Sequence, residues 1–137
     1  MVIDVPETMY AAGSEKPEAI LVAEDEYAVR EIMEKLLENK GYKVISAVDG
    51  EDAVNKFEGH KGCIDMLLFD VMMPGMNGRN AYDRIKKIKP DIKTLFMGGY
   101  SENILTNKDL QDGRVYFLQK PIIPDKLFHK VSEILST

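Results

Sequence analysis

The first strongly apolar segment of the chain, residues 19–26, reads AILVAEDE. Five consecutive apolar residues without alternation are typical of a strand that is buried on both faces of a sheet. Three acidic residues follow at once, so we predict a buried strand over Ala19–Ala23 whose carboxyl end carries negative charge. The preceding stretch contains Pro6, Gly13 and Pro17 without a sustained period. We therefore interpret residues 1–18 as a flexible leader or linker.

Predicted strands and helices alternate along the rest of the chain. Four further short apolar runs predict buried strands, at residues 44–45, 66–69, 95–97 and 115–118. Apolar residues at helical spacing predict five helices, at residues 29–37, 53–57, 81–88, 101–110 and 127–135, of which 101–110 has the weakest pattern. Alternating strands and helices favour right-handed parallel crossovers. We therefore expect residues 19–137 to form one doubly wound α/β domain with a five-stranded parallel sheet.

Composition limits the classes of protein to which the chain can belong. The 137 residues are 45% hydrophobic and 30% charged, the balance of one ordinary soluble domain. The net charge of −5 argues against a nucleic-acid partner, and no apolar run approaches the length of a membrane span, so we expect no membrane contact. Cys63 is the only cysteine and the N-terminus does not read as a secretory signal. These features predict a cytoplasmic location.

Charged residues follow several of the predicted strands at the point where each strand ends. Glu24 and Asp25 follow the first strand, Asp70 follows the third and Lys120 lies just after the fifth. Because parallel strands end at the same edge of a sheet, we expect these side chains to meet where doubly wound sheets bind ligands. A single acidic residue after a strand is usually a helix cap or a solvated charge. The coincidence at several strand ends favours a functional site instead.

The residue types at these strand ends suit one kind of chemistry. Three carboxylates in one cleft repel each other, and a divalent cation relieves that repulsion. Mg²⁺ prefers oxygen ligands, takes one or a few carboxylates and keeps several waters. A lysine beside the metal suits a phosphoryl oxygen, and a carboxylate there can act as the nucleophile that becomes an aspartyl phosphate. The sequence therefore predicts a Mg²⁺-dependent site for phosphoryl transfer.

Three segments of the chain resemble the receiver domain of two-component response regulators. They are VAEDE at residues 22–26, DVMMPGMNG at residues 70–78, and the Lys120-Pro121 pair. The likeness covers about Ala19–Ser136 and implies a flavodoxin-like sheet of strand order 2-1-3-4-5 with five helices. The leader and the stretch Phe96–Ser101 also resemble receivers at the C-terminus of hybrid sensor histidine kinases.

The resemblance implies a role for each matched residue. Asp70 is expected to accept a phosphoryl group from a histidine kinase or a phosphotransfer protein. Mg²⁺ is expected to be held by Glu24 (through water), Asp25, Asp70 and the backbone carbonyl of Met72. Lys120 is expected to pair with the acidic cluster at rest and with the phosphoryl group afterwards. The domain is expected to be a phosphoacceptor in a phosphorelay rather than an enzyme that acts on an external substrate.

Two further positions concern the conformational switch. Phe117 stands where receivers have a rotating aromatic residue. Gly98 departs from the family, because receivers usually carry Ser or Thr there and its hydroxyl bonds the phosphoryl group. We expect the signal to leave through the face of the fourth helix, fifth strand and fifth helix. Since no DNA-binding segment follows Thr137, the expected output is contact with a downstream protein.

Three other functions are weighed against this one. Metal-dependent phosphatases and nucleases typically carry two acidic residues one apart after a strand, and Asp70-Val71-Met72 lacks the second. A flavodoxin-like nucleotide carrier needs a hydroxyl- or glycine-rich loop where this chain has three acidic residues. A degenerate receiver that binds partners without phosphorylation is the main alternative. Gly98 favours it, whereas the presence of Asp70, Lys120 and the metal carboxylates argues against it.

Overall fold

The structure is a computed structural model that describes residues 17–60, 62–99 and 105–137. It contains one sheet of five strands, β1 (Ala19–Ala23), β2 (Lys43–Ala47), β3 (Met66–Asp70), β4 (Lys93–Gly98) and β5 (Val115–Gln119). All neighbouring strands pair in parallel, in the order β2-β1-β3-β4-β5. The predicted five-stranded parallel sheet and its strand order are confirmed.

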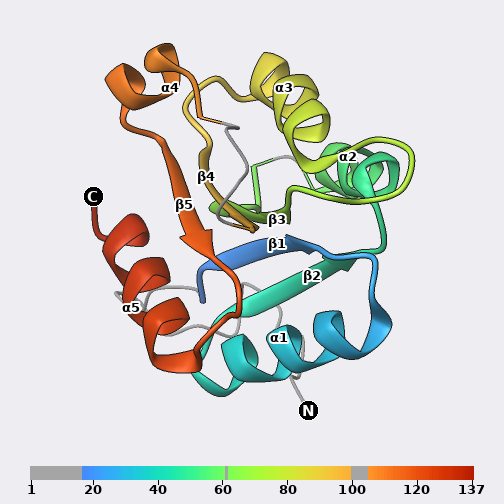
Figure 1. Ribbon diagram of the computed structural model, residues 1–137, viewed down its shortest axis with the longest axis vertical. Coiled ribbons are helices and arrows are strands. Elements are labelled where there is room, and N and C mark those ends of the chain that lie inside the picture. The colour runs from blue at the N-terminus through green and yellow to red at the C-terminus, as the bar shows by residue number, and fades with distance from the viewer. Residues whose placement is uncertain (1–16, 61, 100–104) are drawn as a thin grey trace.

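Helices connect the strands and cover both faces of the sheet (Figure 1). Four helices have ten or more residues, namely α1 (Tyr27–Asn39), α2 (Gly50–Gly59), α3 (Gly78–Ile88) and α5 (Pro124–Leu135). The remaining one, α4 (Asn107–Asp112), has six residues. Figure 1 shows α1 and α5 on one side of the sheet and α2, α3 and α4 on the other. None of the described helices has the length and hydrophobicity that crossing a membrane requires.

Two hydrophobic cores lie on the two faces of the sheet. Alternate residues of each central strand enter opposite cores: Leu21 and Phe69 pack with the buried residues of α2 and α3, whereas Ile20 and Leu68 pack with those of α1 and α5. Every residue of β1 and β3 is buried. Burial on both faces explains why these two strands read as unbroken apolar runs.

The fourth helix agrees with its predicted position only in part. A helix was expected over residues 101–110, but residues 100–104 lie outside the described residues and α4 begins at Asn107. Thr106 is its N-cap: the Thr106 hydroxyl accepts the Asp109 N–H at 3.1 Å, and the Asp109 carboxylate accepts the Thr106 N–H at 2.8 Å. This reciprocal pair is a capping box, and it fixes where the helix starts. The predicted leader also falls outside the description, except for residues 17 and 18.

The start of α3 lies directly against the end of β3. A Cβ atom added to Gly78 would be 2.3 Å from the backbone oxygen of Asp70 and 3.3 Å from the Cα of Val71. A Cβ atom added to Gly59, the last residue of α2, would have no neighbouring atom within 4 Å. A side chain is therefore excluded at Gly78 by backbone atoms that cannot move aside independently.

Gly78→Ala is expected to lower the free energy of unfolding by about 3 kcal/mol, the upper part of the range for overpacking. Gly59→Ala is the matched control and is expected to raise it by up to about 1 kcal/mol, because alanine favours helix more than glycine does. Urea unfolding of the two variants measures both changes. A Gly78→Ala variant as stable as the wild type would show that α3 is not held tightly against β3.

Candidate functional site

Three parallel strands bring the predicted site residues together at one edge of the sheet. Asp70 is the last residue of β3, Glu24 and Asp25 follow β1, and Lys120 follows β5. One carboxylate oxygen from each of the three acidic residues lies within 4.8 Å of the others. Glu24 and Asp70 are buried, whereas Asp25 is exposed. The predicted convergence of these side chains is confirmed.

Lys120 lies between the two buried carboxylates. Its Nζ is 3.0 Å from Oδ2 of Asp70 and 3.6 Å from Oε1 of Glu24. Partial burial lowers the pKa of Lys120, but the interactions with Asp70 and Glu24 outweigh that effect and raise the pKa above its usual value. Lys120 is therefore protonated at neutral pH. Its positive charge offsets part of the repulsion within the acidic cluster.

The position of Glu24 in the site raises the pKa of its carboxyl group. Burial raises the pKa of Glu24 to about 7, and the charge of Asp70 adds to the increase, while the Glu26 N–H and Lys120 act in the opposite direction. Oε2 of Glu24 accepts the Glu26 N–H at 3.1 Å. Oε1 is buried and accepts no hydrogen bond from any described residue. A buried carboxylate oxygen without a donor is destabilising unless a cation compensates it.

The donor set fits a magnesium ion. Three carboxylates from two neighbouring strand ends supply hard oxygen atoms, and Oε1 of Glu24, which has no hydrogen-bond donor but lies 3.6 Å from Lys120 Nζ, is buried beside them. The exposure of Asp25 leaves room for the water ligands that Mg²⁺ retains. Glu24, Asp25 and Asp70 therefore form an acidic pocket that can hold a divalent cation.

Arg30 is a contributor that the sequence analysis missed. It lies in the first turns of α1, and its Nη1 donates to the backbone oxygen of Glu24 at 2.7 Å and to that of Asp25 at 3.5 Å. Its guanidinium group also stacks over the ring of Tyr27, with 5.5 Å from Cζ to the ring centroid. Arg30 thus braces the backbone of the turn that carries two of the acidic residues.

The other predicted residues lie close to the same edge. The Met72 N–H donates to Oδ1 of Asp70 at 3.3 Å, and the Met72 side chain is exposed. Gly98 ends β4, and its carbonyl accepts the Lys120 N–H at 2.8 Å. The backbone there is extended, a conformation that serine also adopts. Phe117 lies in the middle of β5, is half-buried, and packs against the core on the α2 and α3 side.

The combination of sheet topology and acidic pocket defines the class of protein. Residues 20–132 match the response regulator receiver domain family. The chain therefore belongs to that family and is a receiver domain of two-component signalling. Domains of this family generally act as phosphoacceptors rather than as enzymes that turn over an external substrate.

Individual relatives agree with the family assignment. The chain is 35% identical over 116 residues to the sensor kinase CckA of Brucella abortus. The matched region covers 85% of this chain and 12% of that protein. It is 28% identical over 120 residues to the chemotaxis protein CheY of Treponema pallidum, with 87% and 83% of the two chains covered. The chain also spans 30% of a cyclic di-GMP phosphodiesterase of Thermotoga maritima. Several of these relatives are thus much longer proteins.

Solved structures show the same fold. The crystal structure of the receiver domain from the hybrid histidine kinase CckA superposes with a TM-score of 0.73 at 35% identity, covering 85% of this chain and 98% of that one. A response regulator from Chloroflexus aurantiacus gives a TM-score of 0.76 at 27% identity, with 89% and 100% covered. The fold of this chain is therefore that of a receiver domain along nearly the whole of its described length.

Proposed function

We propose that this domain, formed by residues 19–137, accepts a phosphoryl group on Asp70 in a Mg²⁺-dependent reaction in the cytoplasm. The observation that carries the proposal is the contact between a buried Asp70 carboxylate and Lys120 Nζ at 3.0 Å, beside two further carboxylates. Among the described residues this is the group of acidic side chains arranged to hold a metal. The donor is a histidine kinase or a phosphotransfer protein. The similarity to a sensor kinase supports this choice of donor.

The reaction forms one bond and breaks another at phosphorus. An Asp70 carboxylate oxygen attacks the phosphorus atom, and the bond from phosphorus to the imidazole nitrogen of the donor breaks. The electron pair of that bond stays with the imidazole, and Asp70 becomes an acyl phosphate. Lys120 Nζ turns from the carboxylate to the transferred phosphoryl oxygens and offsets their charge.

The acidic residues of this chain would hold the metal. Asp25 and Asp70 would bind it through carboxylate oxygens, Glu24 through water, and Met72 would contribute its backbone carbonyl. When bound, Mg²⁺ supplies positive charge that offsets the negative charge of the phosphoryl oxygens and the carboxylates. Arg30 holds the backbone of the turn after β1, which carries Glu24 and Asp25.

Incubation with acetyl phosphate and Mg²⁺, followed by intact-mass measurement, tests the proposal. The wild type is expected to gain one phosphoryl group that is lost in base, and Asp70→Asn is expected to gain none. Asp91→Asn removes an exposed carboxyl outside the cluster and is expected to behave as the wild type. If the wild type is not modified, the degenerate receiver that only binds partners becomes the better description.

Mg²⁺ is expected to stabilise the wild-type domain, because a ligand that binds only the folded state adds to its stability. At a free concentration of tenfold the Kd, the gain is about 1.4 kcal/mol. Asp25→Asn is expected to abolish most of the increase in Tm, whereas Glu26→Gln, which removes a neighbouring exposed carboxylate, is expected to keep it. Thermal unfolding with Mg²⁺ and with a chelator measures the effect. Equal Mg²⁺-dependent increases in Tm in the two variants would show that the metal does not bind at Asp25.

The output surface is proposed to be formed by α4, β5 and α5, with a downstream protein as the partner. Gly98 offers no hydroxyl to a phosphoryl group on Asp70, and Phe117 is the proposed aromatic switch. Gly98→Ser is therefore expected to increase the response of α4 to a beryllofluoride mimic of the phosphoryl group, read as chemical-shift changes over residues 107–112. A hydrogen bond to a charged group typically contributes about 1.5–3 kcal/mol. An unchanged response would show that the missing hydroxyl has no effect here.

A further inference from the structure

We infer that an ion pair between α3 and α4 couples the state of Asp70 to the position of α4. The ion pair joins Arg79 to Asp109, and we call these two residues and Thr106 the α3–α4 clamp. This inference rests on the proposed function of Asp70. It adds a physical connection between that residue and a helix of the proposed output surface.

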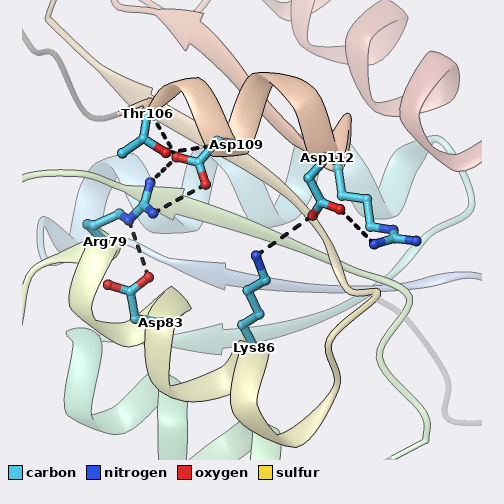
Figure 2. Close-up of polar contacts among 7 residues, drawn as sticks. Arg79, Asp83, Lys86, Thr106, Asp109 and Asp112 are labelled. Atoms are coloured by element: carbon cyan, nitrogen blue, oxygen red, sulfur yellow. Dashed lines mark hydrogen bonds and ion pairs between the residues drawn. The ribbon is translucent and has the colours of Figure 1, made fainter.

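The clamp is a buried contact with two hydrogen bonds. Figure 2 shows the Arg79 guanidinium from α3 facing the Asp109 carboxylate from α4, with Nη1 bonded to Oδ2 and Nη2 bonded to Oδ1, the latter at 3.2 Å. The same carboxylate accepts the Thr106 N–H that starts α4. Asp109 is only 2% exposed. A carboxylate this deeply buried is strongly destabilising without its cation, so the pair does not separate without a large loss of stability.

The Arg79 side chain is itself held in place on α3. Its Nε is 3.3 Å from Oδ1 of Asp83 one turn along the helix, as Figure 2 shows. The Arg79 guanidinium lies 5.3 Å from the ring centroid of Tyr82, a fully buried residue that packs edge-on against Phe96 of β4. These contacts leave Arg79 little freedom to follow Asp109 by changing its own conformation.

The first turn of α3 is tied to the end of β3, where Asp70 lies. The Gly78 N–H donates to the Val71 carbonyl at 3.0 Å, and a Cβ at Gly78 would overlap the Asp70 carbonyl. Arg79 is the next residue. The loop between β3 and α3 also contacts the Asp70 side chain, because the Met72 N–H donates to Oδ1 of Asp70 at 3.3 Å.

A mechanical consequence follows from these contacts. Adding a phosphoryl group to Asp70 changes the acceptor that the Met72 N–H faces and displaces Lys120 from the carboxylate. Any shift of the β3–α3 loop then moves Gly78 and Arg79 with it. Since Asp109 is buried and Arg79 is held on α3, α4 either moves together with the first turn of α3 or loses its buried counterion. Both outcomes change how α4 is docked.

A second ion pair between the same two helices provides a matched control. Lys86 Nζ lies 3.7 Å from Oδ2 of Asp112, at the far end of α3 from the Asp70 loop (Figure 2). Its partner Asp112 is also paired with Arg114 at 2.9 Å and is partly exposed. Lys86→Gln therefore removes an α3–α4 ion pair, together with the contact of Lys86 Nζ over the Tyr82 ring at 5.7 Å, while it leaves the hydrogen bonds between Arg79 and Asp109 in place.

The test compares wild type, Arg79→Gln and Lys86→Gln, each with Mg²⁺ and with or without beryllofluoride. Amide hydrogen exchange reports on α4, and titration followed by ¹⁹F NMR gives the affinity for beryllofluoride. In the wild type and in Lys86→Gln, beryllofluoride is expected to change exchange over residues 107–112 by about fivefold or more, the lower end of typical coupling between sites. In Arg79→Gln, beryllofluoride is expected to change amide exchange over residues 107–112 by less than about twofold.

Reciprocity separates coupling from a merely structural role. If α4 and Asp70 are coupled through Arg79, the loss of α4 response in Arg79→Gln must come with a change in beryllofluoride affinity by the same factor. A wild-type affinity in Arg79→Gln, or an α4 response equal to that of the wild type, would overturn the clamp while leaving the proposed function intact. Failure of the wild type to bind beryllofluoride at all would contradict the proposed function, and the coupling with it.

Discussion

Lys120→Ala is expected to slow phosphoryl incorporation at Asp70 by on the order of 100-fold, the usual effect of removing one group that stabilises charge in a transition state. Lys120 Nζ lies 3.0 Å from the carboxylate that is proposed to receive the phosphoryl group, so its charge is placed to offset that of the phosphoryl oxygens. The measurement is the initial rate of acetyl phosphate incorporation at saturating Mg²⁺.

Magnesium binding separates this effect from a general loss of the site. Lys120 and a cation at the cluster compete for the Asp70 and Glu24 carboxylates, so removing Lys120 is expected to leave Mg²⁺ affinity unchanged or to increase it. Lys126→Ala removes an exposed lysine of α5 and is expected to keep the wild-type rate. A Lys120→Ala variant that is phosphorylated at the wild-type rate would assign no role in the reaction to this residue.

Asp109→Ala is expected to lower the free energy of unfolding by about 3 kcal/mol, the low end of the range for removing one partner of a buried ion pair. The change leaves Arg79 without its α4 partner and removes the capping box of that helix. The low end applies because the Arg79 side chain is 24% exposed and keeps its contact with Asp83. Asp112→Ala, at a more exposed ion pair, is expected to change stability by less than about 1 kcal/mol. Similar losses in both variants, measured by urea unfolding, would contradict this difference.

The pH dependence of stability is a second test of the interactions of the Asp109 carboxylate. Burial raises the pKa of Asp109, but hydrogen bonds from Arg79 and from the backbone and hydroxyl of Thr106 outweigh it, so the pKa lies below the usual value. A carboxyl whose pKa is lower in the folded state stabilises the fold above its unfolded pKa of about 3.9, and this contribution disappears as the pH falls further. Lowering the pH from about 4 to about 2 is therefore expected to reduce the free energy of unfolding less in Asp109→Ala than in the wild type.

The central strands could be predicted from the sequence because each is short, wholly buried and therefore uniformly apolar. Ala19–Ala23 has the same bounds in the structure as in the prediction. Parallel pairing then placed the residues after β1, β3 and β5 at one edge, which is why the acidic cluster and Lys120 could be found from residues far apart in the chain. Asp49 is the N-cap of α2, as its residue type favours, and its side chain accepts the Asp52 N–H at 2.8 Å.

The bounds of the fourth helix could not be predicted because it is six residues long and has little apolar periodicity. The signal that fixes its start is instead the Thr106–Asp109 spacing of a capping box, which apolar periodicity does not reveal. Arg30 and Arg79 were missed for a different reason. Their partners are a backbone carbonyl and a residue 30 positions away, and neither can be read from local pattern.

Asp70 is proposed to be the residue that carries the phosphoryl group. Reduction with borohydride tests it most directly, because an acyl phosphate on aspartate is converted to homoserine, which peptide mass spectrometry then locates. After treatment with acetyl phosphate and Mg²⁺, we predict homoserine at position 70 and nowhere else in the chain. Homoserine at Asp25 or at any other residue, with Asp70 unmodified, would contradict the account.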